Sequence, residues 1–388
     1  MLEVGQKEID AVAKVIRSGK LFRHNQDSQC ARFEQRYSAY LGTKYVHLCA
    51  SGTQALTAGL VGLGIGPGDE VIVPAHTYMA TAIAVLSAGA IPVIVDVDAS
   101  ITMNPEALDD AIGPRTRAVI PVHMWGVVCN MRSIMRIARK RKLLVLEDAC
   151  QCVGGGYERK KVGTIGHAGA YSFNYFKNMT CGEGGAVVTR SRQVSQRARC
   201  AIDSCGFYWT GRDSDAQPFA SMGARGSEIE GAMMNAQLDR IDTLIRRMRS
   251  QKKRVITAMS KMSHLIAPSH SLDHECGLMN AFTLPDEASA ERFAGETGGV
   301  IAGRTGRHTF NEWDQVLARR GAHHPALNPY TLPQNRKCRR TYPKSLCRAS
   351  LDILGRTVMV QNDPKRNADD VKALIAKIRT AAEAVPSE

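Results

Sequence analysis

The 388-residue chain has no segment with the compositional bias of a disordered tail or linker, and it contains no internal repeat. Its eleven cysteines, scattered from Cys30 to Cys347, are odd in number and do not resemble a disulfide framework. Cys150 and Cys152 form a C-x-C, but no second pair follows at zinc-finger spacing. These absences predict mostly buried thiols in a reducing, cytoplasmic setting and no metal site.

An apolar signal core is also absent, because the N-terminal segment MLEVGQKEIDAVAKVIRSGK is amphipathic and polar. The stretch 71–95 has no Asp, Glu, Lys or Arg and is long enough to cross a bilayer. Pro74, Gly89 and Pro92 interrupt it and divide it into VIVPA, TYMATAIAVLSAGA and IPVIVDVD. We interpret it as strand, helix and strand of a soluble α/β core, and we expect no membrane partner.

Acidic residues are fewer than basic ones, 37 against 51, which gives a formal net charge of +14. Such an excess favours anionic ligands. The densest basic cluster is RKCRR at 336–340, without a nucleic-acid motif or interleaved aromatic residues beside it. An anionic small substrate would use the same charge, so we expect no nucleic-acid partner.

What remains is an ordinary globular composition, 44% hydrophobic and 23% charged, in a chain longer than most single domains. Between about residues 45 and 190, short apolar runs alternate with helical segments, which predicts an α/β fold with a mainly parallel sheet. The predicted strands are YVHLCAS, EVIVPAH, IPVIVDVD, RAVIPVHMWG, KLLVLEDAC, GAYSF and GGAVVT. The predicted helices lie near 52–63, 79–88, 105–112 and 131–141.

Residues 228–263 read as one long helix or two abutting ones. Beyond them, the weak strands HLIAPS, LMNAFTL and TVMVQND and the closing helix ADDVKALIAKIRTAAEA predict a smaller α+β domain. We therefore divide the chain into an N-terminal arm, 1–30, a large domain, 31–250, and a small C-terminal domain, 251–388.

The most informative residue is Lys177, in SFNYFKNMTCGEGG, about thirty residues after the apolar run KLLVLEDACQ. A strand that ends in Asp148, followed by a lysine in a Gly-rich turn, is a recognisable way of holding pyridoxal phosphate. The lysine amine forms an imine, and the carboxylate keeps the pyridine nitrogen protonated. Taken alone, the pattern also fits a surface lysine after a buried strand.

Further cofactor contacts occur in the right order. SGTQALTAGL follows a strand and opens a helix, where Gly52 allows close approach and Thr53 offers a hydroxyl to a phosphate; a plain N-cap is the alternative. Tyr78 can stack on a flat ring or can be a core aromatic residue. Gln151 can bond a ring hydroxyl, and Ser172 can add a phosphate contact.

Two other features, a histidine and a glycine-rich run, resemble functional motifs. His123, at a strand end, could touch substrate or cofactor, although a lone histidine there is more often structural. GLGIGPG is not a dinucleotide fingerprint, because its glycines end a helix and precede a strand.

Several motifs together resemble the DegT/DnrJ/EryC1/StrS family of PLP-dependent sugar aminotransferases. They are SGTQAL, EVIVPAHTYMAT, PVIVDVD, PRTRAVIPVHMWG, EDACQ, YSFNYFKNMTCGEGGAVVT and AQLDRID. The resemblance is dense from about 40 to 190, looser to about 245 and faint beyond. It implies the aspartate aminotransferase-like type I fold, pyridoxal 5'-phosphate as cofactor, and a homodimer with the active site at the subunit interface.

By position, the resemblance implies that Lys177 is the Schiff-base lysine and the proton shuttle. Asp148 would pair with the pyridine nitrogen, Gln151 with the ring oxygen, and Tyr78 would stack on the ring. The phosphate would be held by Gly52, Thr53 and Ser172.

The implied reaction takes an amino group, usually from glutamate, and delivers it to a keto- or aldehydo-sugar. Within the family, LFRHN, TCGEGG and NEW before a Pro-rich stretch are similar to 8-amino-3,8-dideoxy-octulosonate transaminases, which aminate an acidic sugar destined for lipopolysaccharide. A nucleotide-linked sugar is the other substrate class that the family implies.

The sequence departs from the family at three places. MGARGSE keeps Arg225, a tentative substrate residue, but lacks the usual Asn two residues before it, which puts the contact with a neighbouring subunit's phosphate in doubt. His167 replaces the usual Asp before the lysine strand, and Arg159 replaces the usual Gly of the preceding hairpin. The alternative function is therefore a catalytically altered PLP-binding member, dehydratase-like or regulatory. Sugar dehydratases carry His at the imine position, so Lys177 argues against that reaction.

Overall fold

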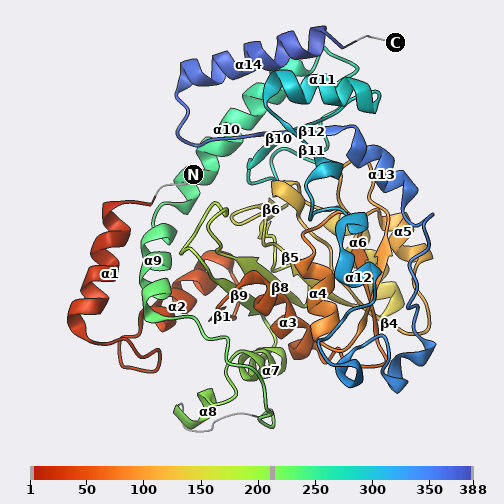
Figure 1. The fold of residues 1–388 in the computed structure, drawn as a ribbon. Coiled ribbons are helices and arrows are strands. Elements are labelled where there is room, and N and C mark those ends of the chain that lie inside the picture. Colours follow the sequence, from red (N-terminus) through yellow and green to blue (C-terminus); the bar gives the residue numbers. More distant parts are fainter. Residues whose placement is uncertain (1–3, 210–214, 386–388) are drawn as a thin grey trace.

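The computed structural model describes residues 4–209 and 215–385, and its centre is a seven-stranded sheet (Figure 1). Four neighbouring strand pairs are parallel, and β9 runs antiparallel to both of its neighbours. The predicted mainly parallel sheet is therefore confirmed, with each predicted strand present. In spatial order the strands are β1 (Tyr45–Cys49), β9 (Gly185–Thr189), β8 (Ala168–Ser172), β5 (Leu144–Asp148), β4 (Thr116–Val119), β2 (Glu70–Pro74) and β3 (Ile91–Val95).

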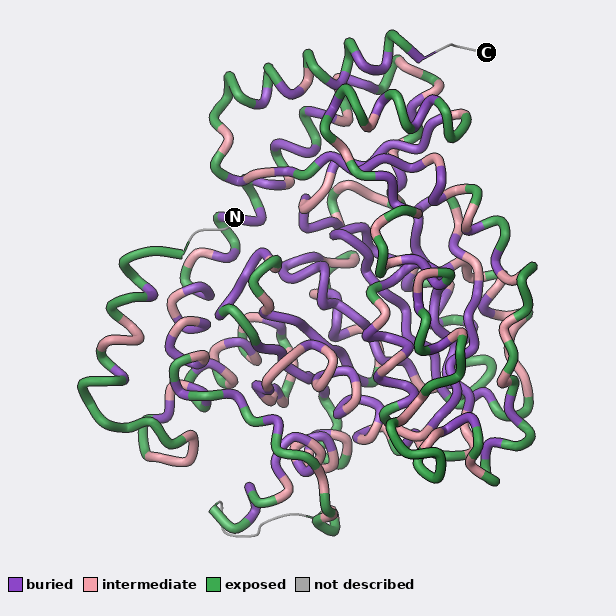
Figure 2. Tube along the Cα trace, in the orientation of Figure 1, coloured by how far each residue is buried: buried purple, intermediate pink, exposed green. Residues whose placement is uncertain are grey.

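Both faces of this sheet are covered, which explains why its strands are continuous apolar runs rather than alternating ones. In β2, Val71 and Val73 pack in one buried cluster with Leu56 and Val85 of α3 and α4. Ile72, between them, points to the opposite face and joins the cluster that contains helix α6. Figure 2 shows the resulting buried centre and the exposed outer turns.

The helices predicted within 45–190 are present, and residues 228–263 form two abutting helices. α3 begins at a cap, where the Ser51 hydroxyl accepts from the Gln54 N–H at 3.2 Å, and it ends at Gly64 in the left-handed conformation. The helices up to this point in the chain are α1 (Gln6–Ser18), α2 (Gln29–Leu41), α3 (Gly52–Leu63), α4 (Ala80–Ser87), α5 (Pro105–Asp110), α6 (Met131–Arg141), α7 (Arg192–Ile202), α8 (Gly206–Trp209), α9 (Glu228–Leu238) and α10 (Ile241–Met259). A small hairpin consists of β6 (Gly156–Tyr157) and β7 (Lys160–Lys161).

The C-terminal part contains a second, three-stranded antiparallel sheet in the order β10-β12-β11, which packs with α10, α11 and α14. Of the three weak strands predicted there, HLIAPS forms only a bridge between Ile266 and Thr283, because Pro268 has no N–H for a ladder. The elements are β10 (Met279–Thr283), α11 (Glu287–Thr297), β11 (Val300–Ile301), α12 (Asp314–Leu317), α13 (Arg348–Gly355), β12 (Thr357–Gln361) and α14 (Ala368–Glu383). Single 3-10 turns are η1 (Met124–Gly126), η2 (Ala302–Arg304), η3 (Phe310–Glu312), η4 (Pro325–Leu327) and η5 (Pro333–Lys337).

One later segment returns to the large sheet. Phe310, Trp313 and Tyr330 are buried in the same cluster as Val73 of β2 and Ile94 of β3. This return places the residues just before Phe310 at the carboxyl end of β2. The three-part division of the chain stays a prediction, and the outermost residues of its first and last parts, 1–3 and 386–388, lie outside the described residues.

Three sequence predictions concern the cysteines, membrane-spanning helices and metal sites. All eleven cysteines are free, and Cys205 alone among them is exposed. Within 4–209 and 215–385, no helix combines the length and apolarity needed to cross a membrane. The same residues bring together no cluster of three or more His, Cys, Asp or Glu side chains suited to a metal ion.

Candidate active site

Asp148 is a buried carboxylate at the carboxyl end of β5, with 4% of its surface exposed. One carboxylate oxygen accepts the Thr81 hydroxyl at 2.8 Å, and the other accepts the Cys150 backbone N–H at 3.0 Å. No ion pair of this carboxylate is found within the described part of the chain. A buried charge with only neutral donors needs a cationic partner, and a protonated ring nitrogen has that charge and that hydrogen.

Thr81 was not predicted from the sequence. It lies in the first turn of α4, is fully buried, and is 2.7 Å from the Thr77 hydroxyl. Because a carboxylate only accepts, the Thr81 hydrogen goes to Asp148, and Thr77 donates to Thr81. This chain of hydroxyl groups fixes the direction in which the carboxylate faces.

Two glycines allow the start of α3 to lie against the end of β8 and the start of β9. A Cβ on Gly52 would lie 2.7 Å from the Cβ of Ser172, and a Cβ on Gly185 would lie 2.3 Å from the Ser51 carbonyl oxygen. The first N–H groups of a helix have no acceptor within the helix, and its dipole favours an anion there. The Ser172 hydroxyl beside those N–H groups makes a cradle that suits a phosphate.

Lys177 lies in the turn between β8 and β9, where its backbone N–H donates to the Asn174 carbonyl at 2.9 Å. Burial lowers the pKa of its amine, while Cys150 and Asp148 act in the opposite direction. Lys177 and Asp148 thus influence each other electrostatically across the same space. A lowered pKa makes the neutral amine, which is the nucleophile and the base, more accessible near neutral pH.

Tyr78, just before α4, is exposed, with 43% of its surface accessible. Its ring centroid is 5.6 Å from that of His308, which in turn is 5.2 Å from Trp125. Trp125 has φ 47° and ψ 32°, a left-handed conformation that an aromatic residue rarely adopts. Backbone strain of this kind is concentrated at binding sites.

A sequence profile of the DegT/DnrJ/EryC1/StrS aminotransferase family matches residues 3–292. The chain belongs to this family. It is 41% identical over 216 residues to GDP-perosamine synthase of Caulobacter vibrioides, covering 54% of this chain and 56% of that protein. It is 36% identical over 235 residues to dTDP-3-amino-3,4,6-trideoxy-alpha-D-glucose transaminase of Streptomyces venezuelae, covering 60% of each. These matches span less than two thirds of either relative's length.

The similarity to solved structures covers more of the chain than the sequence matches do. The aminotransferase from Psychrobacter cryohalolentis superposes with a TM-score of 0.83 at 25% identity, over 99% of this chain and 98% of that chain. This likeness confirms the predicted fold: the chain has the type I fold of PLP-dependent aminotransferases.

Within this DegT-family fold, His123 does not reach an open surface. It is fully buried; its Nε2 is 3.1 Å from the Glu147 carboxylate, and its Nδ1 accepts the Cys129 N–H at 3.3 Å. With both nitrogens occupied, the geometry favours the structural alternative over substrate contact. Gln151 is buried in the turn after β5, and no hydrogen bond of its amide is found among the described residues. The pairing of Gln151 with a ring oxygen stays a prediction.

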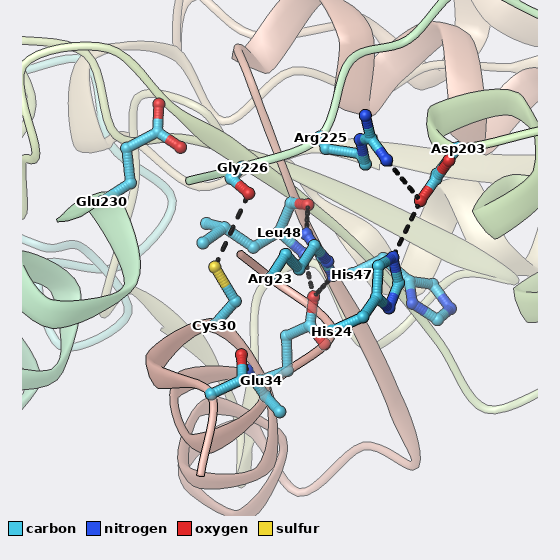
Figure 3. Close-up of polar contacts among 12 residues, drawn as sticks. Arg23, His24, Cys30, Glu34, His47, Leu48, Asp203, Arg225, Gly226 and Glu230 are labelled. Carbon is cyan, nitrogen blue, oxygen red and sulfur yellow. Dashed lines mark hydrogen bonds and ion pairs between the residues drawn. The ribbon is translucent and has the colours of Figure 1, made fainter. Parts of the chain in front are cut away.

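Arg225 lies in a second polar cluster, which Figure 3 shows. Its guanidinium is 3.7 Å from the Asp203 carboxylate, which also lies 3.2 Å from His24. Backbone pairing with Cys49 holds Arg225 near the start of α3. Its side chain pairs with Asp203 rather than with Lys177 or Asp148, so its role toward substrate also stays a prediction. A hollow of 240 Å³ adjoins this cluster and is lined by Arg23, His24, Ala31, Glu34, His47, Arg199, Ile202 and Asp203.

His167, which replaces the usual Asp of the family, forms hydrogen bonds with Val145 of β5. Its Nδ1 accepts the Val145 N–H at 2.9 Å, and its backbone N–H donates to the Val145 carbonyl at 2.8 Å. Burial lowers the pKa of His167, with Arg139 acting in the same direction, so the ring stays neutral and keeps its acceptor. A neutral imidazole therefore supplies the acceptor that an Asp side chain could provide at this position.

Three histidines make the stability of the fold sensitive to acid. Burial, with smaller effects of nearby cationic groups, lowers the pKa of His47 and His308 to about 3, and burial lowers that of His76 to about 4. As the pH falls through the unfolded value of about 6.5, only the unfolded chain takes up these protons. We expect the free energy of unfolding to fall by about 1.4 kcal/mol per pH unit for each histidine, down to about pH 4.

Urea unfolding between pH 7.5 and 4 measures this slope. His47→Gln should make the slope shallower, because one of the three titrating groups is gone. His323→Gln, at an exposed position, is the control and should leave the slope unchanged. A free energy of unfolding that stays constant down to pH 4.5 would contradict the prediction.

Proposed function

We propose that this protein is a PLP-dependent aminotransferase that moves an amino group from glutamate to a keto- or aldehydo-sugar. Membership in the DegT family supports the reaction class, and pyridoxal phosphate is the cofactor of that family. The observation that carries the assignment to this chain is the buried Asp148 carboxylate, for which no ion pair is found among residues 4–209 and 215–385. The described residues fit the cofactor: a phosphate cradle, a carboxylate for the ring nitrogen and an amine lie in one region.

Each of these residues has a separate task. Asp148 holds positive charge at the ring nitrogen, and Thr81 keeps that carboxylate aligned. Ser172 and the first turn of α3 hold the phosphate. When bound, the cofactor supplies an electron sink next to the reacting carbon.

Lys177 carries out the proton transfer that amino transfer requires. Its neutral Nζ takes a proton from the carbon that carries the donor's amino group and returns a proton to a neighbouring atom, which is general acid–base work. The same Nζ would hold the cofactor covalently until the donor's amino group displaces it, which frees the amine for the proton transfer. The exposed Tyr78 would provide a flat surface for the cofactor ring.

The substrate class follows from charge and from the relatives. A net charge of +14 favours an anionic sugar, either an acidic octulosonate of lipopolysaccharide or a nucleotide-linked sugar. The names of the two relatives, GDP-perosamine synthase and a dTDP-aminosugar transaminase, support the nucleotide-linked class. The LFRHN and NEW motifs support the octulosonate class.

A cytoplasmic homodimer is part of this proposal. The exposed Tyr78 leaves the site open in a single chain, as expected where a second copy completes it. Gly223 stands where family members carry the Asn that reaches the neighbouring phosphate, and this favours the second candidate, a catalytically altered PLP-binding protein.

An absorbance titration distinguishes these candidates. The protein loaded with pyridoxal phosphate should show the visible band of the bound cofactor, and glutamate should move that band to the near ultraviolet. Adding acidic keto-sugars or nucleotide-linked keto-sugars one at a time should restore the visible band and identify the acceptor. A visible band that neither glutamate nor any other amino acid changes would leave the altered, non-transferring protein as the better account.

A further inference from the structure

A segment from the C-terminal half of the chain forms one wall of the candidate active site. The Thr77 N–H donates to the His308 carbonyl at 2.9 Å, and the Met79 N–H donates to the Arg307 carbonyl at 3.2 Å. A backbone bridge also joins His76 to Thr309. The two residues that flank Tyr78, Thr77 and Met79, therefore fix the backbone of His308 and Arg307 at the carboxyl end of β2.

The backbone of this segment is fixed from within. The Glu312 carboxylate accepts the backbone N–H groups of Gly306 at 2.6 Å, His308 at 3.0 Å and Thr309 at 3.1 Å. Glu312 is thus engaged by backbone donors rather than by the neighbouring arginine. The exposed guanidinium of Arg307 has no hydrogen bond or ion pair within residues 4–209 and 215–385.

The charge of Arg307 is felt inside the site. Burial is the largest cause that lowers the pKa of Lys177, and Arg307 adds to it. Burial also lowers the pKa of His308 to about 3, with Arg307 and Lys177 acting in the same direction, so His308 is neutral. The Arg307 guanidinium therefore lies within electrostatic reach of the Lys177 amine and favours its neutral form.

We propose that Arg307 binds the carboxylate of the substrate whose reacting carbon lies at Lys177. The inference rests on the proposed function and adds a specificity residue to it. Guanidinium and carboxylate groups match as a planar, bidentate pair. The Gly306–Thr309 segment, held by Glu312, carries the Arg307 guanidinium, and no described residue pairs with that guanidinium. Two molecules could bring this carboxylate: the amino-acid donor, through its α-carboxylate, and an acidic sugar acceptor.

Binding of succinate, a dicarboxylate without an amino group, tests the residue directly. Calorimetric titration of the cofactor-loaded protein should show that Arg307→Met weakens succinate binding about 10- to 100-fold, the effect of losing a charge-assisted pair. Arg307→Lys keeps the charge but not the planar, bidentate guanidinium, so its affinity for succinate should lie between those of Arg307→Met and the unaltered protein. Arg304→Met is the matched control, because Arg304 lies on the same segment but pairs with Glu287 and Glu291.

Two kinetic arms identify the source of the carboxylate. In the donor arm, Arg307→Met should raise KM for glutamate about 10- to 100-fold and abolish the preference for glutamate over its α-amide. In the acceptor arm, it should instead raise KM for an acidic keto-sugar and leave a neutral one unaffected. A change in either arm supports the proposal and names the source.

The inference is overturned if Arg307→Met binds succinate as tightly as the unaltered protein and leaves both KM values unchanged. Failure of the proposed function looks different, because the unaltered protein itself would then show no change of its cofactor band with glutamate. Melting temperatures of the three variants should match that of the unaltered protein, since both arginines are exposed.

Discussion

Lys177→Ala is expected to lower kcat/KM for amino transfer by about 10⁴-fold or more, the upper end of the range for one positioned acid–base group. The loss exceeds that of a single proton transfer because the same amine also holds the cofactor covalently. No hydrogen bond of the Lys177 amine is found in the described part of the chain, so its removal leaves no buried partner unpaired. The free energy of unfolding should therefore stay the same or rise slightly.

Two additions sharpen this prediction. A small primary amine such as ethylamine, supplied in solution, should restore part of the activity of Lys177→Ala by taking over the proton transfer. Lys161→Ala is the matched control: Lys161 is also partly buried, and it bonds the Tyr40 hydroxyl at 2.9 Å outside the site. That variant should lose stability and keep its activity. If Lys177→Ala turned over glutamate at the normal rate, the assignment of this lysine would be wrong.

The second large effect is expected for Asp148→Asn, which keeps the shape of the side chain and removes its charge. Without the carboxylate, the ring nitrogen loses its proton and the cofactor becomes a poorer electron sink. We expect kcat to fall about 10²- to 10³-fold, as when one electrostatic contact of a transition state is removed. Folding should change little, because the Thr81 hydroxyl can turn and accept from the new amide.

Steady-state kinetics with glutamate measures this change. Asp109→Asn is the control, since Asp109 is a surface carboxylate that pairs with Arg141, at the end of α6, outside the candidate site. Thr81→Val should show a smaller loss than Asp148→Asn, because it removes only the group that aligns the carboxylate. A kcat of Asp148→Asn within a few-fold of the unaltered protein would show that this carboxylate does not face the ring nitrogen.

The sequence predicted the parts of the site that are local in the chain. A buried apolar run places Asp148 at a strand end, and the Gly-rich turn around Lys177 follows within the same sheet. Gly52 could be identified because a small residue after a strand and before a helix indicates close approach, and the structure shows Ser172 as the neighbour that requires it. These signals lie within short windows, where strand and helix patterns can be read.

The remaining features depend on contacts between distant segments. Arg307 and His308 lie in a loop that no periodicity describes, and they join the site only because the chain returns to β2. Thr81 looks like an ordinary helix residue until its hydroxyl is seen to face Asp148. His123 shows the reverse case, since its strand-end position suggested a site residue, yet Glu147 holds it in the interior.

We propose above all that Lys177 binds pyridoxal phosphate covalently. The most direct measurement is to load the protein with pyridoxal phosphate, reduce it with borohydride, and map the modified peptide by mass spectrometry. We expect one reduced pyridoxyl group on the peptide that contains Lys177, and none on Lys177→Ala. Modification of a different lysine, or none at all in a folded and cofactor-saturated protein, would contradict it.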